Sequence, residues 1–190
     1  MQYIKSPIDK MTPMVVYIIL IFTGIVNIVI VNYTYYMGDF FGDYSLIDLE
    51  LAGTMVNANI IIDYWKSIDV IQWAYFHLGL DFLFLITYSV FLFLGCHSSA
   101  LQLKSFPFII YLGLVVGWLQ PLAGIFDFIE NYSLLHVLSN TSDDFLPRLA
   151  SWCAMPKFAI ALSGMAYCVI ALVISTSIGI ISQGKNSSNS

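Results

Sequence analysis

Four long apolar runs limit what this chain can fold into more than any other feature of its sequence. They lie at about 13–31, 70–96, 108–130 and 157–181, and polar residues separate them. A helix rises about 1.5 Å per residue, so the shortest run spans roughly 28 Å as a helix, close to the hydrocarbon thickness of a bilayer. We therefore expect four membrane-spanning helices.

The overall composition favours the same fold class. Hydrophobic residues make up 59% of the 190 residues and charged residues only 10%, whereas soluble domains are about 45–50% apolar. This length suits a single compact bundle. We predict an all-α, polytopic membrane four-helix bundle that forms one domain over 1–182, followed by a disordered tail at 183–190.

The charge and the motifs exclude several functional classes. The net charge is -5, with seven Lys and Arg residues, so the chain lacks a basic surface for nucleic acid. No Walker, dinucleotide-binding or haem-attachment motif occurs, and we expect no cofactor. The expected partner is the lipid bilayer, and a homo-oligomer is left open.

The three cysteines suggest no chemistry by their spacing. A helix from Cys153 to Cys168 would separate these two residues by about 22 Å, which is too far for a disulfide. Isolated cysteines in apolar sequence usually act as small hydrophobic residues. We expect Cys96, Cys153 and Cys168 to do the same.

The basic residues suggest an orientation in the membrane. The first run follows Lys5 and Lys10 and lacks an obvious cleavage site, which favours an uncleaved signal anchor. If both termini are cytoplasmic, four basic residues lie inside (Lys5, Lys10, Lys104, Lys185) and three lie outside (Lys66, Arg148, Lys157). We expect a cell membrane protein with both termini cytoplasmic.

The first connection, at 32–69, is acidic and contains two apolar patterns. Ile47, Leu49 and Leu51 alternate with acidic residues, which predicts a short extended piece. Within Met55 to Ser67, after a capping Thr54, apolar residues recur at spacings of three and four (Met55, Ala58, Ile62, Trp65). This stripe predicts an amphipathic helix that rests on the outer end of the bundle.

Two of the apolar runs carry polar stripes at helical spacing. The second run has His77, Asp81 and Tyr88 on one face, and the third has Gln120, Gly124, Asp127 and Asn131 on one face. Both faces should point toward the inside of the bundle. Pro121 predicts a kink in the third helix. We expect 139–156 to be a loop with at most a short helix, because prolines interrupt it, so that Lys157 opens the fourth helix.

Charged side chains within apolar runs are costly, at roughly 2.5–3.5 kcal/mol each. The candidate site residues are Asp81, Tyr88, Asp127, Glu130, Asn131 and Lys157. We favour a structural role, in which these groups join the helices through hydrogen bonds worth about 0.6–2 kcal/mol each.

Two other roles remain open, and with them the question of whether the protein is an enzyme. Paired carboxylates in a membrane can serve as general acid and base, as in a hydrolase or proton-transfer enzyme that acts on a lipid or another apolar substrate. The chain can also be one subunit of an oligomeric channel or transporter, since four spans without a repeat make a poor transporter in one copy.

A metal site would draw on His77, Asp81, Asp127 and Glu130. These residues lie at i, i+4 and i, i+3 spacings and can in principle converge. Because no established metal signature is present, we expect no metal.

Depth along the helices predicts one ion pair. Lys157 and the end of the third run fall at the same membrane boundary, so we expect Lys157 to pair with Asp127 or Glu130. Asp81 lies deeper, roughly 22 Å of helix from the cytoplasmic end of its own run. It should face inward without contacting Lys157.

Five pieces of the sequence resemble an uncharacterised family of small bacterial four-span membrane proteins. They are LDLELAGT, the LDFLF that is followed by Tyr88, GIFDFIEN, PRLA, and Lys157 at the start of the last span. Together they cover about 140 residues from Leu46 onward. The resemblance implies a four-span architecture and a cluster of polar positions. It implies no reaction.

Overall fold

The computed structural model describes residues 7–103, 106–139 and 143–187, and within these ranges all regular structure is helical. Four helices are long: α1 (Pro13–Gly38), α4 (Ile71–Gln102), α5 (Pro107–Leu138) and α6 (Phe145–Ser187). The short elements are η1 (Pro7–Lys10), η2 (Asp39–Phe41), α2 (Leu46–Glu50) and α3 (Met55–Ser67). Each long helix contains a segment long and apolar enough to cross a membrane. The prediction of an all-α membrane four-helix bundle is confirmed.

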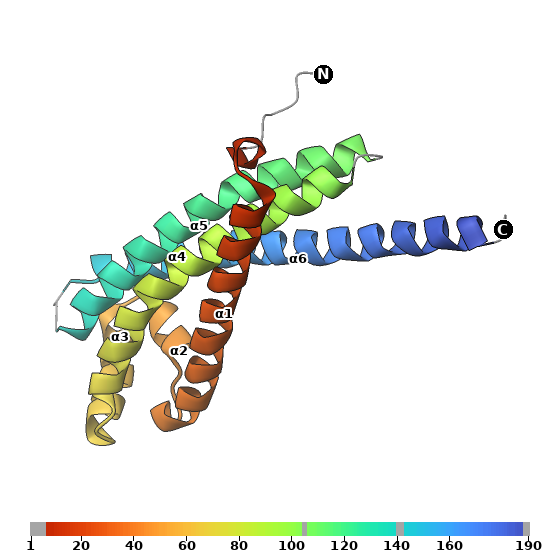
Figure 1. Cartoon of the computed structure of the whole chain (residues 1–190). Coiled ribbons are helices and arrows are strands. Elements are labelled where there is room, and N and C mark those ends of the chain that lie inside the picture. Colours follow the sequence, from red (N-terminus) through yellow and green to blue (C-terminus); the bar gives the residue numbers. More distant parts are fainter. Residues whose placement is uncertain (1–6, 104–105, 140–142, 188–190) are drawn as a thin grey trace.

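The centre of the bundle is the pair α4 and α5, which lie side by side (Figure 1). α1 crosses α4 on one side, and α6 packs against both α4 and α5 before its C-terminal part leaves the bundle. α2 and α3 lie at the end of the bundle opposite both chain termini. This end carries the first connection, so the polar residues near it can meet residues from three spans.

The helices are longer than the apolar runs that predict them. α1 continues to Gly38, α4 to Gln102 and α5 to Leu138, the last without interruption at Pro121. Proline is tolerated inside membrane helices where neighbouring groups satisfy the freed carbonyl. α6 continues through Ser187, beyond residue 182, where we place the end of the domain. Residues 188–190 lie outside the described ranges.

The loop predicted for 139–156 is wrong over most of its length, because α6 begins at Phe145. Pro147 lies in the first helical turn, where a proline removes no helical hydrogen bond. Beyond it, Ala150, Cys153 and Ala154 are buried against the bundle. The packing of these small side chains stabilises the helical turns ahead of Lys157.

The extended piece predicted around Leu49 is also wrong, because 46–50 form helix α2. Ser45 caps this helix reciprocally: its hydroxyl accepts from the Asp48 backbone N–H at 3.3 Å, and the Asp48 carboxylate accepts from the Ser45 backbone N–H at 2.7 Å. Such a capping box favours a helical start. Five residues are too few for hydrophobic alternation to outweigh it.

Helix α3 confirms the predicted amphipathic segment. Thr54 Oγ1 accepts a hydrogen bond from the Asn57 backbone N–H at 3.3 Å and caps the helix. All four residues of the predicted stripe are buried, and they share one apolar core with the ends of α4 and α5. The Met55 backbone N–H also donates to Asp144 Oδ1 at 2.7 Å, which ties the start of α3 to the residue that precedes α6.

Candidate functional site

Lys157 of α6 lies between two carboxylates of α5. Its Nζ donates to Glu130 Oε1 at 2.7 Å and to Asp127 Oδ1 at 3.0 Å, and all three side chains are buried. The predicted pairing of Lys157 is confirmed with both candidates. One turn of α5 presents the two acids on the same face because they are three residues apart.

Glu50, at the end of α2, is a third acid beside the same ammonium group. Its Oε2 lies 3.7 Å from Lys157 Nζ, and its side chain is only 13% exposed. Its backbone carbonyl accepts a hydrogen bond from Ser151 Oγ of α6 at 2.8 Å. Sequence reasoning missed Glu50 as a site residue because it falls in a connection rich in surface acids. The available signal was its place within LDLELAGT, which the resemblance marks.

Asp81 of α4 joins the group through an amide. Asn131 Nδ2 donates to Asp81 Oδ2 at 2.8 Å and, more weakly, to Asp127 Oδ1 at 3.4 Å. Among the described residues the ion pairs of Lys157 go to Glu50, Asp127 and Glu130, so Asp81 faces inward without pairing to it, as predicted. The greater depth predicted for Asp81 is wrong, because its carboxylate lies at the level of Asn131. Tyr88, one of the predicted candidates, is buried on the same side of α4 and interacts with Asp127.

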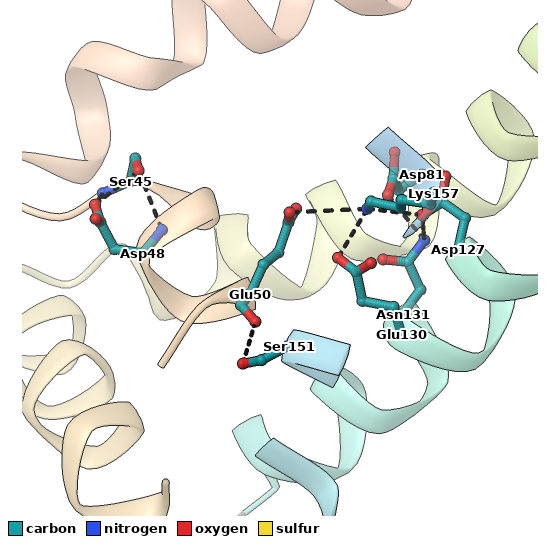
Figure 2. Close-up of polar contacts among 9 residues, drawn as sticks. All are labelled: Ser45, Asp48, Glu50, Asp81, Asp127, Glu130, Asn131, Ser151 and Lys157. Atoms are coloured by element: carbon teal, nitrogen blue, oxygen red, sulfur yellow. Dashed lines mark hydrogen bonds and ion pairs between the residues drawn. The ribbon is translucent and has the colours of Figure 1, made fainter. Parts of the chain in front are cut away.

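We use the name charge cluster for six residues: Glu50, Asp81, Asp127, Glu130, Asn131 and Lys157. Figure 2 shows them converging from α2, α4, α5 and α6. Gln120 adds a separate link between α5 and α6, since its Nε2 donates to the Ile160 carbonyl at 3.1 Å. The polar faces of α4 and α5 therefore point into the bundle, as predicted. Glu50 of α2 joins the charge cluster from outside the spans.

The charge cluster contains more hydrogen-bond acceptors than the described residues have donors to match. It has four carboxyl groups and one ammonium group. Three buried oxygens, Glu50 Oε2, Glu130 Oε2 and Asn131 Oδ1, accept no hydrogen bond within the described parts of the chain. A protonated carboxyl group both donates and accepts, so one bound proton would give a neighbouring oxygen its donor. The arrangement is chemically suited to holding a proton.

Glu50 lies outside the spans, and its titration follows from its surroundings. Burial raises the pKa of Glu50 above its ordinary value, and the attraction of Lys157 acts against this rise. The neighbouring carboxyl groups of Asp81 and Asp127 raise the pKa further. The net effect of these surroundings is a raised pKa of Glu50.

The metal hypothesis receives no support from the geometry. His77 Nε2 makes a hydrogen bond of 3.0 Å with Thr34 Oγ1, so this ring nitrogen is bonded to α1 and not to the carboxylates of the charge cluster. Within 7–103, 106–139 and 143–187, His, Cys, Asp and Glu side chains form no group of three or more that is arranged to hold a metal ion.

Two hollows in the surface lie away from the charge cluster. One, of about 440 Å³, is an apolar groove between α4 and α5 lined by residues such as Phe93, Trp118 and Phe128. The other, of about 330 Å³, lies between α2 and α3 beside Asp48 and Asn57. None of the six cluster residues lines either hollow.

Comparisons with known proteins identify no relative: no family model, no curated protein and no solved structure matches the chain.

Proposed function

We propose that the charge cluster is a structural centre that fastens α6 and the first connection to the α4 and α5 pair of this multi-pass membrane protein. One observation carries the proposal: the single ammonium group of Lys157 lies within 4 Å of carboxylates from two other elements, α5 and α2. A cation shared in this way opposes separation of the elements that carry the anions.

The magnitudes favour this role. Leaving one buried charge without its partner costs about 3–5 kcal/mol, whereas an exposed ion pair contributes about 1 kcal/mol or less. The total stability of a typical protein is only about 5–15 kcal/mol. Removal of one partner should therefore cost a large share of the stability of the bundle.

The chain offers a matched control for testing this role. Lys66 pairs with Asp63 at 3.7 Å, but both side chains are substantially exposed. We expect Lys157→Ala to lower the thermal unfolding temperature of the protein in detergent strongly and to speed proteolysis of the α2 and α3 connection. Lys66→Ala should change neither. Equal behaviour of the two variants would refute the structural proposal.

A second candidate is a membrane-embedded enzyme of the hydrolase or proton-transfer type that acts on a lipid or another apolar substrate. It is favoured by the three buried oxygens that accept no hydrogen bond from the described residues, since a purely structural cluster should satisfy its polar groups. Its candidate catalytic residues are Asp81, Tyr88, Asp127, Glu130, Asn131 and Lys157.

Glu130→Gln separates the two candidates. The amide keeps the shape of the side chain but removes its acid and base chemistry. The purified protein, reconstituted in vesicles of mixed phospholipids, would be incubated and the lipids examined by mass spectrometry. Conversion of a lipid by the parent, lost in Glu130→Gln while the unfolding temperature is kept, supports the enzyme. An unchanged lipid profile with the parent counts against it.

We also propose that the protein lies in the cell membrane with both termini in the cytoplasm. The proposal is supported by the four-to-three distribution of basic residues and by the even number of spans found among the described residues. The charge cluster and α3 would then lie toward the outer boundary.

A further inference from the structure

Two cysteines that are far apart in the sequence have their thiols in contact. Cys96 of α4 and Cys168 of α6 are separated by 72 positions, and their Sγ atoms lie 3.7 Å apart. Cys96 is fully buried, and its Sγ also lies 3.7 Å from the Gly164 carbonyl oxygen. We expected the cysteines to act only as small hydrophobic residues, and their spacing in the sequence gives no sign of this contact.

The backbone near the pair brings the two helices close together. A side chain at Gly95 would begin only 3.2 Å from Cys168 Sγ, so the glycine leaves room for the thiol. The surrounding core contains small and aliphatic side chains, including Ala100 and Ala171. A disulfide bond measures about 2.05 Å, so the sulfur atoms need to approach by only about 1.7 Å.

Cys153 provides an internal contrast. It lies on α6 about 22 Å of helix from Cys168, near the opposite end of the span. It is buried among other residues of α6 and the charge cluster end of the bundle. The pairing is therefore specific to two of the three cysteines.

We propose that Cys96 and Cys168 form a redox-active dithiol that a lipid-soluble quinone oxidises to a disulfide between α4 and α6. Both S–H bonds break and one S–S bond forms. The two electrons and two protons reduce the quinone to a quinol. The apolar surroundings of the thiols suit an oxidant that is dissolved in the membrane.

The bond would fix α6 within its packed part, which continues past Cys168 to Ala171 and Ile174. Side chains around and beyond Cys168, such as Val169 and Leu172, are mostly exposed, and the C-terminal part of α6 projects away from α4 and α5 (Figure 1). A covalent link to α4 at this level limits how far α6 can swing. The oxidation state of the pair would thus control the freedom of the C-terminal part of the chain.

The test counts thiols in the full-length protein. Purified protein in detergent is treated with diamide or, separately, with a fully substituted short-chain benzoquinone, which has no free ring position for thiol addition. It is then denatured and labelled with a maleimide. Untreated protein should carry three labels, and protein from either treatment should carry one. Peptide mapping should find Cys96 linked to Cys168.

Three variants make the outcome decisive. Cys153→Ser should fall from two labels to none, whereas Cys96→Ser and Cys168→Ser should keep two labels after treatment. Three labels in the treated parent, links between two protein molecules only, or a link that includes Cys153 would overturn the pairing. A link formed with diamide but not with the quinone would overturn the assignment of the oxidant. If a variant fails to fold, the label count and the peptide map of the parent still decide between these outcomes.

Discussion

Glu130 and Lys157 make the closest contact of the charge cluster, with Oε1 and Nζ 2.7 Å apart and both side chains withdrawn from solvent. The contact joins α5 to α6 at the level where α2 adds Glu50. A buried lysine destabilises the fold unless neighbouring carboxylates balance its charge. Substitution of one partner at a time measures how much the stability of the fold depends on this balance.

Removal of the lysine should be partly compensated by removal of an acid. Lys157→Ala leaves buried carboxylates without a cation and should cost about 3–5 kcal/mol of stability. Adding Glu130→Gln or Asp127→Asn removes one stranded charge, so at least one double variant should unfold at a higher temperature than Lys157→Ala alone. Thermal unfolding in detergent measures this. If both double variants unfold below the single variant, the charges do not interact as described.

Glu50 should fasten the first connection to α6. Its carboxylate lies 3.7 Å from Lys157 Nζ, and its carbonyl accepts from Ser151. Glu50→Ala should expose α2 and α3 to protease at least several-fold faster than in the parent, while the four spans stay intact. Asp43→Ala, at an exposed position of the same connection, is the control and should be cut at the parental rate. Equal cleavage of all three proteins would show that Glu50 anchors nothing.

The raised pKa of Glu50 predicts the sign of a pH effect. Burial raises this pKa above 4.5 in the folded protein, so the folded state binds the proton more tightly than the unfolded state does. The resulting contribution to stability is present below about pH 4.5 and is lost as the pH rises through the folded-state pKa. The groups that face Glu50 are Lys157, Glu130, Asp127 and Asp81, and all of them remain in a Glu50→Gln variant.

The parent should therefore lose stability relative to Glu50→Gln as the pH rises above about 4.5. The difference between their unfolding temperatures, measured at intervals across this range, isolates Glu50 from the other titrating groups. A difference that stays constant, or that moves in favour of the parent with rising pH, would contradict a raised pKa for Glu50.

Trp65 should be shielded from water. It is fully buried in α3, its Nε1 donates to the Tyr44 carbonyl at 3.2 Å, and its ring packs on Phe41 with centroids 5.1 Å apart. In a variant without the other three tryptophans, aqueous iodide should quench its fluorescence far less than that of free tryptophan. Quenching equal to that of the free amino acid would mean that α3 does not pack on the bundle.

The orientation can be decided with a single introduced cysteine. Asp43 is exposed in the first connection. In a variant whose native cysteines are replaced by serine, a cysteine at position 43 should react with a membrane-impermeant maleimide added outside intact cells. Reaction only after the cells are opened would place the connection in the cytoplasm and reverse the proposed topology.

The sequence by itself determined the four spans, because twenty or so apolar residues in a row have few alternatives to a membrane helix. It also determined which faces of α4 and α5 are polar, since the helical period assigns Asp81, Asp127 and Asn131 to faces without reference to any neighbour. The start of α3 followed from the capping residue Thr54, which acts within its own turn.

Only the tertiary structure decided which residues the polar faces of α4 and α5 contact. Helical periodicity gives neither the rotation of one helix against another nor their relative height, so the contact between Cys96 and Cys168 has no signature in their spacing. The same holds for Glu50, whose role depends on α2 folding back onto α6. The early start of α6 is decided by burial of Ala150 and Ala154, which outweighs the local signal of two prolines. Local residues fix helices and their faces, whereas packing between distant segments fixes the site.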